Sequence, residues 1–322
     1  MHFFVKREFC PVCEGTSFVD LYFKPYSDNI ISSYLEQFYG SQGYIELNYL
    51  KEASYSLKQC RHCKLVFQEF IPNAFLTKKL YEEWIDPVIA KKEVCGHPLS
   101  YYLRHANEIS MLIRYFGVPP SRLTFLDFGM GWCEWLLVAR GFGCVTYGME
   151  LSLERIAHAK QLGIEVLDWD DVPACKVDYI NTEQVFEHLP DPLGTLKHLS
   201  KGLKEGGLLK ISVPNGNRFA KRSQRIDWDA PKFSTNSPNV VAPLEHINCF
   251  STRTLVLLAE RCNLVPVRLM FDNLTDLSVK EVAKTVMRPI FDRVINGGST
   301  TIFLKKNKSS LGVSRLIANG NC

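Results

Sequence analysis

The feature that most constrains the fold is an apolar segment at residues 123–128 that leads directly into the turn Gly129-Met130-Gly131. Downstream, apolar segments of strand length alternate with segments of helical periodicity. The expected strands are residues 144–149, 164–167, 177–181 and 207–213, and the expected helices are residues 132–140, 152–162 and 192–204. Because such alternation builds a parallel sheet with helices on both faces, we predict an α/β, Rossmann-like, doubly wound fold.

The last third of the chain adds two strands to this prediction. LVPVRLMFDN and STTIFLKK, which begin at Leu264 and Ser299, are expected to pair antiparallel and to complete a seven-stranded sheet. Residues 277–296 between them are expected to form a helical insert. Residues 307–322 are polar and are expected to form a loose tail.

Two Cys-x-x-Cys pairs near the start of the chain predict a zinc site. Each pair can direct two thiolates at one point, and two pairs make a closed tetrahedral site, which is structural because no position is left for a substrate. Polar and apolar residues alternate before the second pair, and an apolar stretch follows it. This pattern is typical of a strand–knuckle–strand ribbon. The alternative is four free thiols. The predicted ligands are Cys10, Cys13, Cys60 and Cys63.

These patterns divide the chain into four parts. Apolar residues spaced by three or four positions predict a long helix at residues 99–117, which could also cover the ligand cleft of the larger domain. The parts are a zinc-ribbon module at residues 1–72, a helical linker or cap at 73–118, the Rossmann-like domain at 119–306 and the tail at 307–322.

Composition and charge argue against several classes of protein. No apolar run approaches the roughly 20 residues that cross a bilayer, and the first residues lack the apolar core of a signal peptide. A cytoplasmic protein without membrane contact is therefore expected. The net charge of +4 is too small to indicate a nucleic-acid partner. The densest basic stretch, Lys201–Arg225, is expected to be a solvated face, with an anionic substrate as the alternative.

Three interpretations of the glycine turn differ in the ligand that it would hold. Asp127-Phe128-Gly129 spells the DFG sequence of protein kinases, but no HRD sequence precedes it. A dinucleotide loop needs a third glycine, where Glu134 stands here. Its phosphates would also lie beside the acidic Asp127 and Glu134. A cofactor with a cationic end and no phosphate removes this repulsion, and the glycines still let the backbone approach it closely.

The order and spacing of the motifs resemble class I S-adenosylmethionine-dependent methyltransferases, in the branch with an N-terminal four-cysteine zinc ribbon. LDFGMGWC resembles their first motif, GMELS the second and VLDWDDVP the third, and VFEHLPDPLGTLKHL, LKEGGLLKISVPN and EHINCFSTRTL resemble later blocks. The resemblance covers about residues 10–13, 60–70 and 123–260. It implies S-adenosylmethionine as the cofactor and a structural zinc ion.

The resemblance also implies a set of cofactor contacts. The acid after the first strand attracts the cationic cofactor, the acid after the second strand accepts both ribose hydroxyls, and the acid of the third motif meets the adenine amino group beside an aromatic ring. Cys133 replaces the third glycine of the first motif, and its small side chain is expected to be tolerated. The implied residues are Asp127, Phe128 (with core packing as the alternative), Gly129, Gly131, Trp132, Glu150, Leu151, Asp168, Trp169 and Glu183.

Methyl transfer to oxygen or carbon usually also needs a base. His188 follows the fourth strand, whose carboxyl end faces the ligand crevice, and His246 lies in residues 214–250, which are expected to form an irregular lid. Both histidines are catalytic candidates, as base or substrate contact, and the alternative for each is a structural role. His158 is expected to be a plain surface residue. Gln184 stands where metal-binding relatives carry a glutamate, so no catalytic metal is expected.

The sequence thus predicts an enzyme that methylates a small molecule. The resemblance implies a sugar, a nucleotide-sugar or a natural-product intermediate as the acceptor. Two alternatives stay open. One is a non-catalytic adaptor whose zinc ribbon binds a partner while its nucleoside-binding domain is vestigial. The other is an RNA-modifying methyltransferase that uses the ribbon as an RNA clamp.

Overall fold

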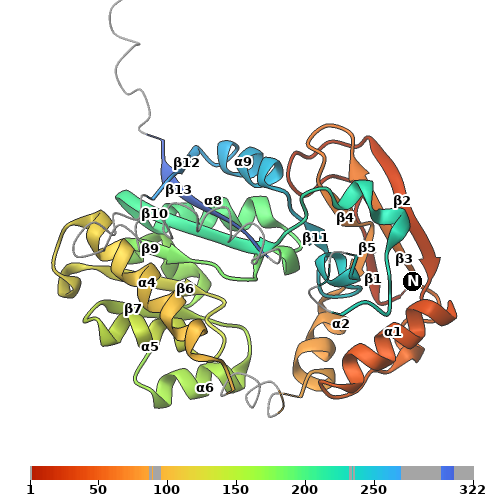
Figure 1. Cartoon of the computed structure of the whole chain (residues 1–322), viewed down its shortest axis with the longest axis horizontal. Coiled ribbons are helices and arrows are strands. Elements are labelled where there is room, and N and C mark those ends of the chain that lie inside the picture. The colour runs from red at the N-terminus through yellow and green to blue at the C-terminus, as the bar shows by residue number, and fades with distance from the viewer. Residues whose placement is uncertain are drawn as a thin grey trace, which may run out of the picture.

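A seven-stranded sheet and a four-stranded sheet organise the chain (Figure 1). The computed structural model describes residues 2–86, 89, 96–231, 234, 236–269 and 299–307. The helical insert expected at residues 277–296 and all but the first residue of the expected tail lie outside these ranges. Within them, no helix combines the length and the apolar character that a membrane span requires.

The larger sheet has the strand order β12-β13-β10-β9-β6-β7-β8. Neighbouring strands from β10 to β8 are parallel, whereas β13 runs antiparallel to both β10 and β12. This order confirms the predicted doubly wound sheet and the predicted antiparallel pair. The strands are β6 (Thr124–Phe128), β7 (Val145–Met149), β8 (Glu165–Val166), β9 (Val177–Asn181), β10 (Leu203–Pro214), β12 (Leu264–Val267) and β13 (Ser299–Lys306).

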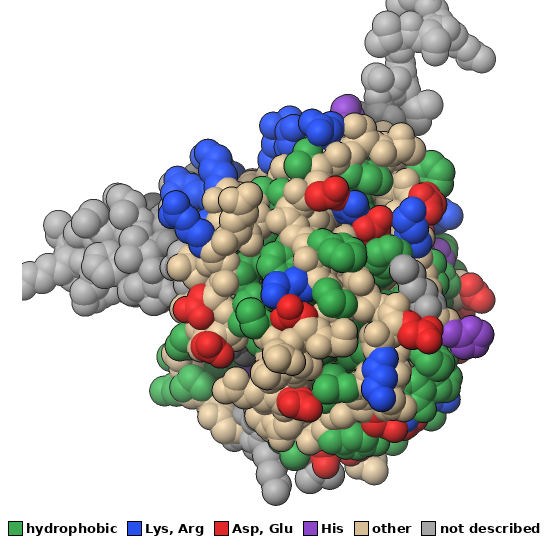
Figure 2. Space-filling model, turned by 90° about the vertical axis from the view of Figure 1, so that its right-hand side faces the viewer, with side chains coloured by type: hydrophobic (Ala, Val, Ile, Leu, Met, Phe, Trp, Pro, Cys, Tyr) green, Lys and Arg blue, Asp and Glu red, His purple; other side chains and the backbone are tan. Residues whose placement is uncertain are grey.

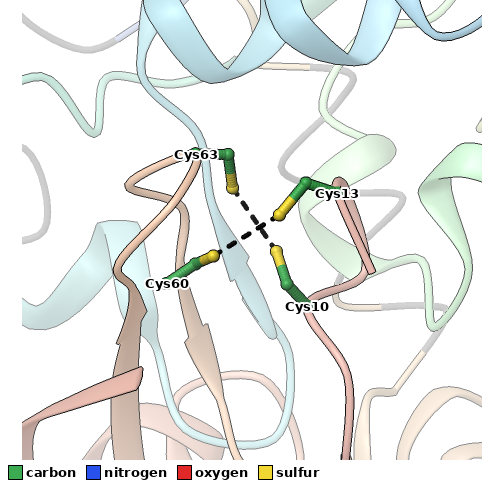
Figure 3. Close-up of side chains that lie close together, drawn as sticks. All are labelled: Cys10, Cys13, Cys60 and Cys63. Atoms are coloured by element: carbon green, nitrogen blue, oxygen red, sulfur yellow. Dashed lines mark hydrogen bonds between the residues drawn. The ribbon is translucent and has the colours of Figure 1, made fainter. Parts of the chain in front are cut away.

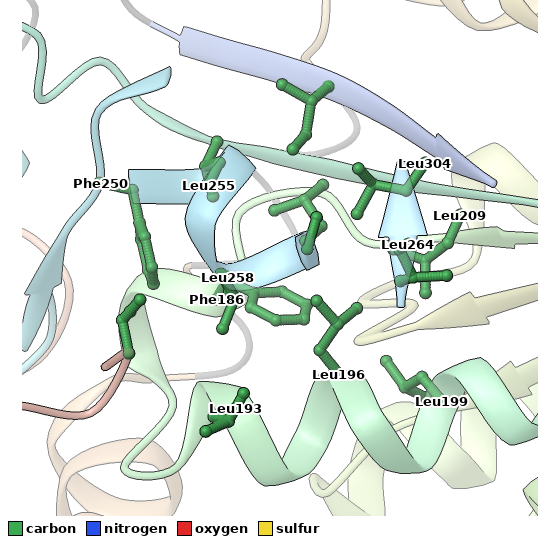
Figure 4. Packing of buried hydrophobic residues seen from close by; sticks show 14 of the residues in the cluster. Phe186, Leu193, Leu196, Leu199, Leu209, Phe250, Leu255, Leu258, Leu264 and Leu304 are labelled. Carbon is green, nitrogen blue, oxygen red and sulfur yellow. The ribbon is translucent and has the colours of Figure 1, made fainter. Parts of the chain in front are cut away.

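Helices cover both faces of this sheet, because side chains of its central strands alternate between two apolar cores. Phe125 and Leu208 belong to one apolar core. Helices α4, α5 and α6 lie on this side of the sheet (Figure 1). The adjacent residues Leu126 and Leu209 face the core beneath α7, α8 and α9, part of which is drawn in Figure 4. The helices are α4 (Leu99–Phe116), α5 (Glu134–Gly141), α6 (Leu153–Gln161), α7 (Val172–Cys175), α8 (Pro192–Gly202) and α9 (Thr252–Glu260).

Local signals place the ends of two predicted helices. The Ser152 side chain accepts a hydrogen bond from the backbone N–H of Arg155 and so caps α6. Gly117 ends α4 with a left-handed φ of 65°. These ends agree with the predicted helices to within a residue or two.

The smaller sheet has the strand order β11-β4-β3-β2. Strands β3 and β4 are antiparallel and flank the second cysteine pair, which confirms the predicted strand–knuckle–strand ribbon. A separate antiparallel pair joins β1 to β5. The elements are β1 (Phe4–Lys6), β2 (Phe18–Pro25), α1 (Asn29–Gly40), β3 (Ser54–Cys60), β4 (Val66–Gln68), β5 (Phe70–Pro72), α2 (Ala74–Lys79) and the π-helical turn η2 (Leu80–Trp84).

The described part of residues 214–250 is largely irregular, as expected, but the segment also contributes one short strand to a sheet. Their strand β11 (Asn248–Cys249) pairs antiparallel with β4 and so joins the sheet that carries the ribbon. A strand this short has no periodicity of its own, and its pairing satisfies backbone groups at the edge of β4. The ribbon sheet therefore takes one strand from far beyond residue 72. The rest of the segment contains three 3-10 turns, η6 (Phe219–Lys221), η7 (Ser223–Arg225) and η8 (Pro238–Val241).

Candidate active site

The turn between β6 and α5 needs backbone conformations that glycine favours. Gly129 has a φ of 78°, and a Cβ atom there would lie 2.6 Å from the Cγ2 atom of Val185. Gly131 has a φ of 55°. Cys133, which replaces the third glycine, is buried and also left-handed, with a φ of 71°. The turn therefore keeps its shape at a cost of roughly 1 kcal/mol at Cys133.

Asp127 is the last residue but one of β6, just before this turn, and is 3% exposed. The Nδ2 atom of Asn181, at the end of the neighbouring strand β9, donates a hydrogen bond of 2.8 Å to Asp127 Oδ1. Burial raises the pKa of Asp127 to about 7, although this hydrogen bond and the charge of Lys210 favour the ionised form. The carboxyl group therefore changes its charge close to neutral pH.

Glu150 follows β7 and connects this strand to the glycine turn. Its Oε2 atom accepts a hydrogen bond of 3.1 Å from the backbone N–H of Gly131, and its Oε1 atom accepts one of 2.8 Å from that of Leu151. Arg155 Nη1 lies 3.5 Å from Glu150 Oε2. These contacts hold the acidic side chain at the carboxyl edge of the sheet, whereas the side chain of Leu151 is 92% exposed.

Asp168 and Trp169 lie where the 3-10 turn η4 (Trp169–Asp171) begins, and the Asp168 side chain caps this turn. The Trp169 ring stacks on that of His198 at 3.9 Å and lies 6.1 Å from that of Phe128. Trp169 remains 41% exposed. The third motif therefore presents a supported aromatic surface on which a planar ring can stack.

Trp132 is buried against α6. Its ring centroid lies 5.3 Å from that of His158 and 5.9 Å from the guanidinium carbon of Arg155. His158 is thus half-buried against an aromatic ring, which corrects the expectation of a plain surface residue. The reason is packing between the start of α5 and α6, which the pattern of α6 alone does not reveal.

Lys210 is a buried cation, which corrects the expectation of a solvated face at this position. It is 2% exposed, and its Nζ atom lies 2.9 Å from both carboxylate oxygens of Glu108 on α4 and 2.8 Å from Glu183 Oε2. Glu183 also accepts a hydrogen bond of 3.1 Å from Ser212 Oγ. Burial alone would raise the pKa of Glu183, but the charge and hydrogen bond of Lys210, the charge of Arg104 and the hydrogen bond from Ser212 together outweigh burial, and the pKa is lowered.

His188 and His246 come together, with ring centroids 4.9 Å apart. His188 ends the 3-10 turn η5 (Phe186–His188), and its Nδ1 atom lies 3.0 Å from the carbonyl oxygen of Glu245 and 3.1 Å from the hydroxyl of Tyr81. Glu187 beside it is 1% exposed. Burial lowers the pKa of His188 to about 4 and raises that of Glu187 well above its usual range.

The four predicted zinc ligands converge from the two knuckles (Figure 3). Their Sγ atoms all lie within 4.8 Å of one another. Glu14 and Lys64, which follow the two pairs, have left-handed φ values of 60° and 69° and turn the chain back at each knuckle. Four thiols in this arrangement suit a tetrahedral zinc ion. The converging residues are Cys10, Cys13, Cys60 and Cys63.

Several polar residues at this edge are not evident from the motifs. The sequence does carry a signal for Lys210, because it is a lysine between apolar residues of a buried strand. It carries none for Tyr81, because the contact with His188 joins residues 107 positions apart. Asn181 and Glu108 likewise depend on their partners in the fold.

A glycine turn after the first strand of a doubly wound sheet, with an acid after the second strand, defines an α/β protein that binds a nucleoside-type cofactor. A family described as "Methyltransferase domain" matches residues 101–269, which is more than half of the chain. The chain belongs to this methyltransferase family, within the class I S-adenosylmethionine-dependent methyltransferases.

The chain is also similar to individual methyltransferases. Trans-aconitate 2-methyltransferase of Rhodopseudomonas palustris (strain HaA2) is 32% identical over 105 residues, which cover 30% of this chain and only 40% of that protein. The solved plantazolicin methyltransferase BpumL in complex with SAH is 14% identical, with a TM-score of 0.46 over 72% of this chain and 94% of its own. A SAM-dependent methyltransferase from Archaeoglobus fulgidus is 16% identical, with a TM-score of 0.38 over 72% of this chain and 99% of its own.

Proposed function

We propose that this chain transfers the methyl group of S-adenosylmethionine to a small-molecule acceptor. The observation that carries the proposal is the acidic carboxyl edge of β6 and β7, where Asp127 lies just before the glycine turn and Glu150 binds Gly131. An acidic edge attracts the sulfonium and ammonium groups of this cofactor and repels the phosphates of a dinucleotide. Methyl transfer then needs mainly the alignment of donor and acceptor and the exclusion of water.

In this proposal the cofactor follows the edge of the sheet. Gly129 and Gly131 let the backbone approach its methionine part, and Glu150 accepts the ribose hydroxyls. Glu150 Oε2 accepts from one backbone N–H, that of Gly131, and keeps a second lone pair for a ribose hydroxyl, whereas Oε1 already accepts from the backbone N–H groups of Leu151 and Ser152 and would exchange one of these bonds. Asp168 accepts from the adenine amino group beside Trp169. The other proposed contacts are Asp127, Phe128, Trp132, Leu151 and Glu183.

The acceptor is proposed to bind on the side of His188 and His246. Tyr81, from the turn that follows α2, also reaches this side through its contact with His188. Sugars, nucleotide-sugars and natural-product intermediates are the proposed acceptor classes. A carboxylate acceptor, as the name of the trans-aconitate relative indicates for that protein, is a further candidate.

The four cysteines are proposed to bind a structural zinc ion, because all four thiols are used and no ligand position is left open. We keep residues 1–72 as the proposed zinc-ribbon module, 73–118 as the proposed cap and 119–306 as the proposed methyltransferase domain. The shared strand β11 supports a permanent association of the first part with the third.

A small molecule is a better-supported acceptor than RNA. On the face that presents the N-terminal part of the chain (Figure 2), basic side chains gather at the upper edge and acidic ones are scattered over the rest. RNA clamps instead present extended basic surfaces. The adaptor alternative is less well supported, since an adaptor would have no use for the acidic edge at Asp127 and Glu150.

Calorimetry with S-adenosylmethionine and S-adenosylhomocysteine tests the proposal. Glu150→Gln should weaken both ligands by about tenfold, because both carry the ribose. Asp127→Asn should weaken S-adenosylmethionine more than S-adenosylhomocysteine, because only the former carries a sulfonium. Glu165→Gln, at an exposed position of β8, is the matched control and should leave both affinities unchanged.

The outcome separates the three functions. Undiminished cofactor binding in both site variants would overturn the site assignment. Turnover of the cofactor on an extract of small metabolites would exclude the adaptor, and its absence would count against the enzyme. RNA binding that falls steeply with salt would favour the RNA-modifying alternative.

A further inference from the structure

Three groups that can each donate an electron pair to a metal converge behind β9. They are the carboxylate of Glu187, the imidazole of His188 and the imidazole of His246, and their potential ligand atoms all lie within 4.8 Å of one another. Glu187 and His188 come from η5, whereas His246 comes from the segment just before β11. The fold therefore assembles the cluster from two distant parts of the chain.

The hydrogen bonds of the two rings determine which nitrogen carries the proton. His188 Nδ1 lies 3.0 Å from the carbonyl oxygen of Glu245, and His246 Nδ1 contacts the carbonyl oxygen of Asn239. A carbonyl oxygen only accepts, so each Nδ1 atom must carry a proton and donate it. In the neutral imidazole the Nε2 atom then carries the lone pair.

Glu187 has no such arrangement. Its side chain is 1% exposed, and neither carboxylate oxygen accepts a hydrogen bond within the described part of the chain. The Nε2 atom of His188 lies 3.9 Å from Glu187 Oε1, which is too far for a hydrogen bond. A buried carboxylate without a donor is costly. A carboxylate without a donor, beside two imidazoles that donate their protons elsewhere, is a set of electron-pair donors that a bound cation would satisfy.

We propose that Glu187, His188 and His246 bind a divalent transition-metal ion. Two imidazoles and one carboxylate are a donor set that suits Zn²⁺, Fe²⁺ or Co²⁺. Metal-bound histidines characteristically donate their other ring N–H to a carbonyl or carboxylate, as both rings do here. Three protein ligands also leave coordination positions open, in contrast to the closed cysteine site.

The position of the cluster relates it to the acceptor. Val185, two residues before Glu187, contacts the backbone of the glycine turn at Gly129. The cluster therefore follows closely on a residue that packs against the glycine turn, and in the proposed function an open position of a bound ion could take an oxygen of the acceptor and lower its pKa. This last role depends on the proposed function, whereas binding of the ion does not. The expectation of no catalytic metal rests on Gln184 alone, because His246 is far from this motif in sequence and joins the cluster only in the fold.

Titration of full-length, zinc-saturated protein with Co²⁺ in the absence of S-adenosylmethionine tests the site. We expect one further equivalent of Co²⁺ to bind, with an absorption spectrum that lacks sulfur-to-cobalt charge transfer. Glu187→Gln and His246→Gln should each weaken this binding by at least about tenfold. His105→Gln changes another buried histidine, on α4, and should leave cobalt binding unchanged.

Zinc content and thermal unfolding of each variant show whether it is folded. If Glu187→Gln does not fold, Glu187→Asp keeps the charge with a shorter reach and should bind Co²⁺ more weakly than the parent protein. Absence of cobalt binding to the parent protein would overturn the proposal. So would binding that the variants leave intact. If the parent protein does not bind Co²⁺ and Glu187→Gln raises its thermal stability, a proton and not a metal ion occupies Glu187.

Discussion

At the scale of single residues, Asp127 shows how burial sets the charge of the site. Its pKa is raised to about 7, whereas an aspartate in an unfolded chain has a pKa of about 3.9. Between these values the folded protein holds a proton that the unfolded chain has lost. The contribution of Asp127 to the free energy of unfolding therefore falls as the pH rises from about 4 to about 7.

The affinity for S-adenosylmethionine should follow the opposite trend. Only the ionised carboxylate attracts the cationic cofactor, so we predict an affinity that rises by about tenfold between about pH 6 and about pH 8. Calorimetry across this range measures the effect, and Asp127→Asn should flatten the profile. An affinity that is independent of pH in the parent protein would contradict the prediction.

Single residues also differ in how far their sequence reveals them. Gly129 and Gly131 are predictable because left-handed backbone is a local requirement, and even Cys133 is recognisable from its place in the motif. Lys210 stands between apolar residues of a buried strand, which signals burial, but its partner Glu108 lies 102 positions away and is not evident from the sequence. The same limitation hides the pairing of Asp127 with Asn181, which depends on the neighbouring positions of β6 and β9.

At the scale of elements, β11 shows how a two-residue strand can organise a site. The Oδ1 atom of Asn248 accepts a hydrogen bond of 2.8 Å from Arg7, which precedes the first knuckle. Its Nδ2 atom donates to the carbonyl oxygens of Phe186 and Leu189, at 3.1 Å and 2.7 Å. The long strands are predictable from local apolar runs, whereas this connection depends on pairing between β11 and β4.

We predict that Asn248→Asp disturbs this connection. The new carboxylate can still accept from Arg7, but it faces two carbonyl oxygens without a proton to donate. We expect a loss of about 2 kcal/mol in the free energy of unfolding and a fall in methyl-transfer rate, because η5 carries Glu187 and His188. Chemical denaturation and rate measurements test both effects. Asn29→Asp, at the exposed start of α1, is the control, and equal losses in the two variants would refute the role of Asn248.

At the scale of the whole molecule, the cysteine site and the methyltransferase sheet share one apolar core. Cys10, Cys60 and Cys63 belong to the same buried cluster as Phe186 and Leu255. Arg261, just after α9, adds a hydrogen bond of 2.9 Å from Nη1 to the carbonyl oxygen of Val12 within the first knuckle. The ribbon therefore shares an apolar core with Phe186 of η5, which lies far away in sequence, and no pattern in either part predicts this.

Loss of the proposed zinc should thus affect catalysis more than cofactor binding. We predict that Cys60→Ser abolishes the proposed zinc binding and lowers the methyl-transfer rate by at least about tenfold, while the affinity for S-adenosylmethionine, whose proposed contacts lie mainly at the ends of β6 and β7, changes little. Elemental analysis, rates and calorimetry measure the three quantities. Cys262→Ser, at a half-buried thiol that is not one of the four converging cysteines, should change none of them. Parallel loss of cofactor affinity would instead indicate general unfolding.

The pairing of β11 with β4 also dictates an order of events during synthesis. Residues 66–67 leave the ribosome long before residues 248–249, with which they pair. The backbone N–H and C=O groups on the β11 side of β4 therefore have no β-sheet partner while the intervening chain is translated. Early binding of a metal ion by the four cysteines of the two knuckles would stabilise the partly formed sheet of β2, β3 and β4 until β11 is synthesised.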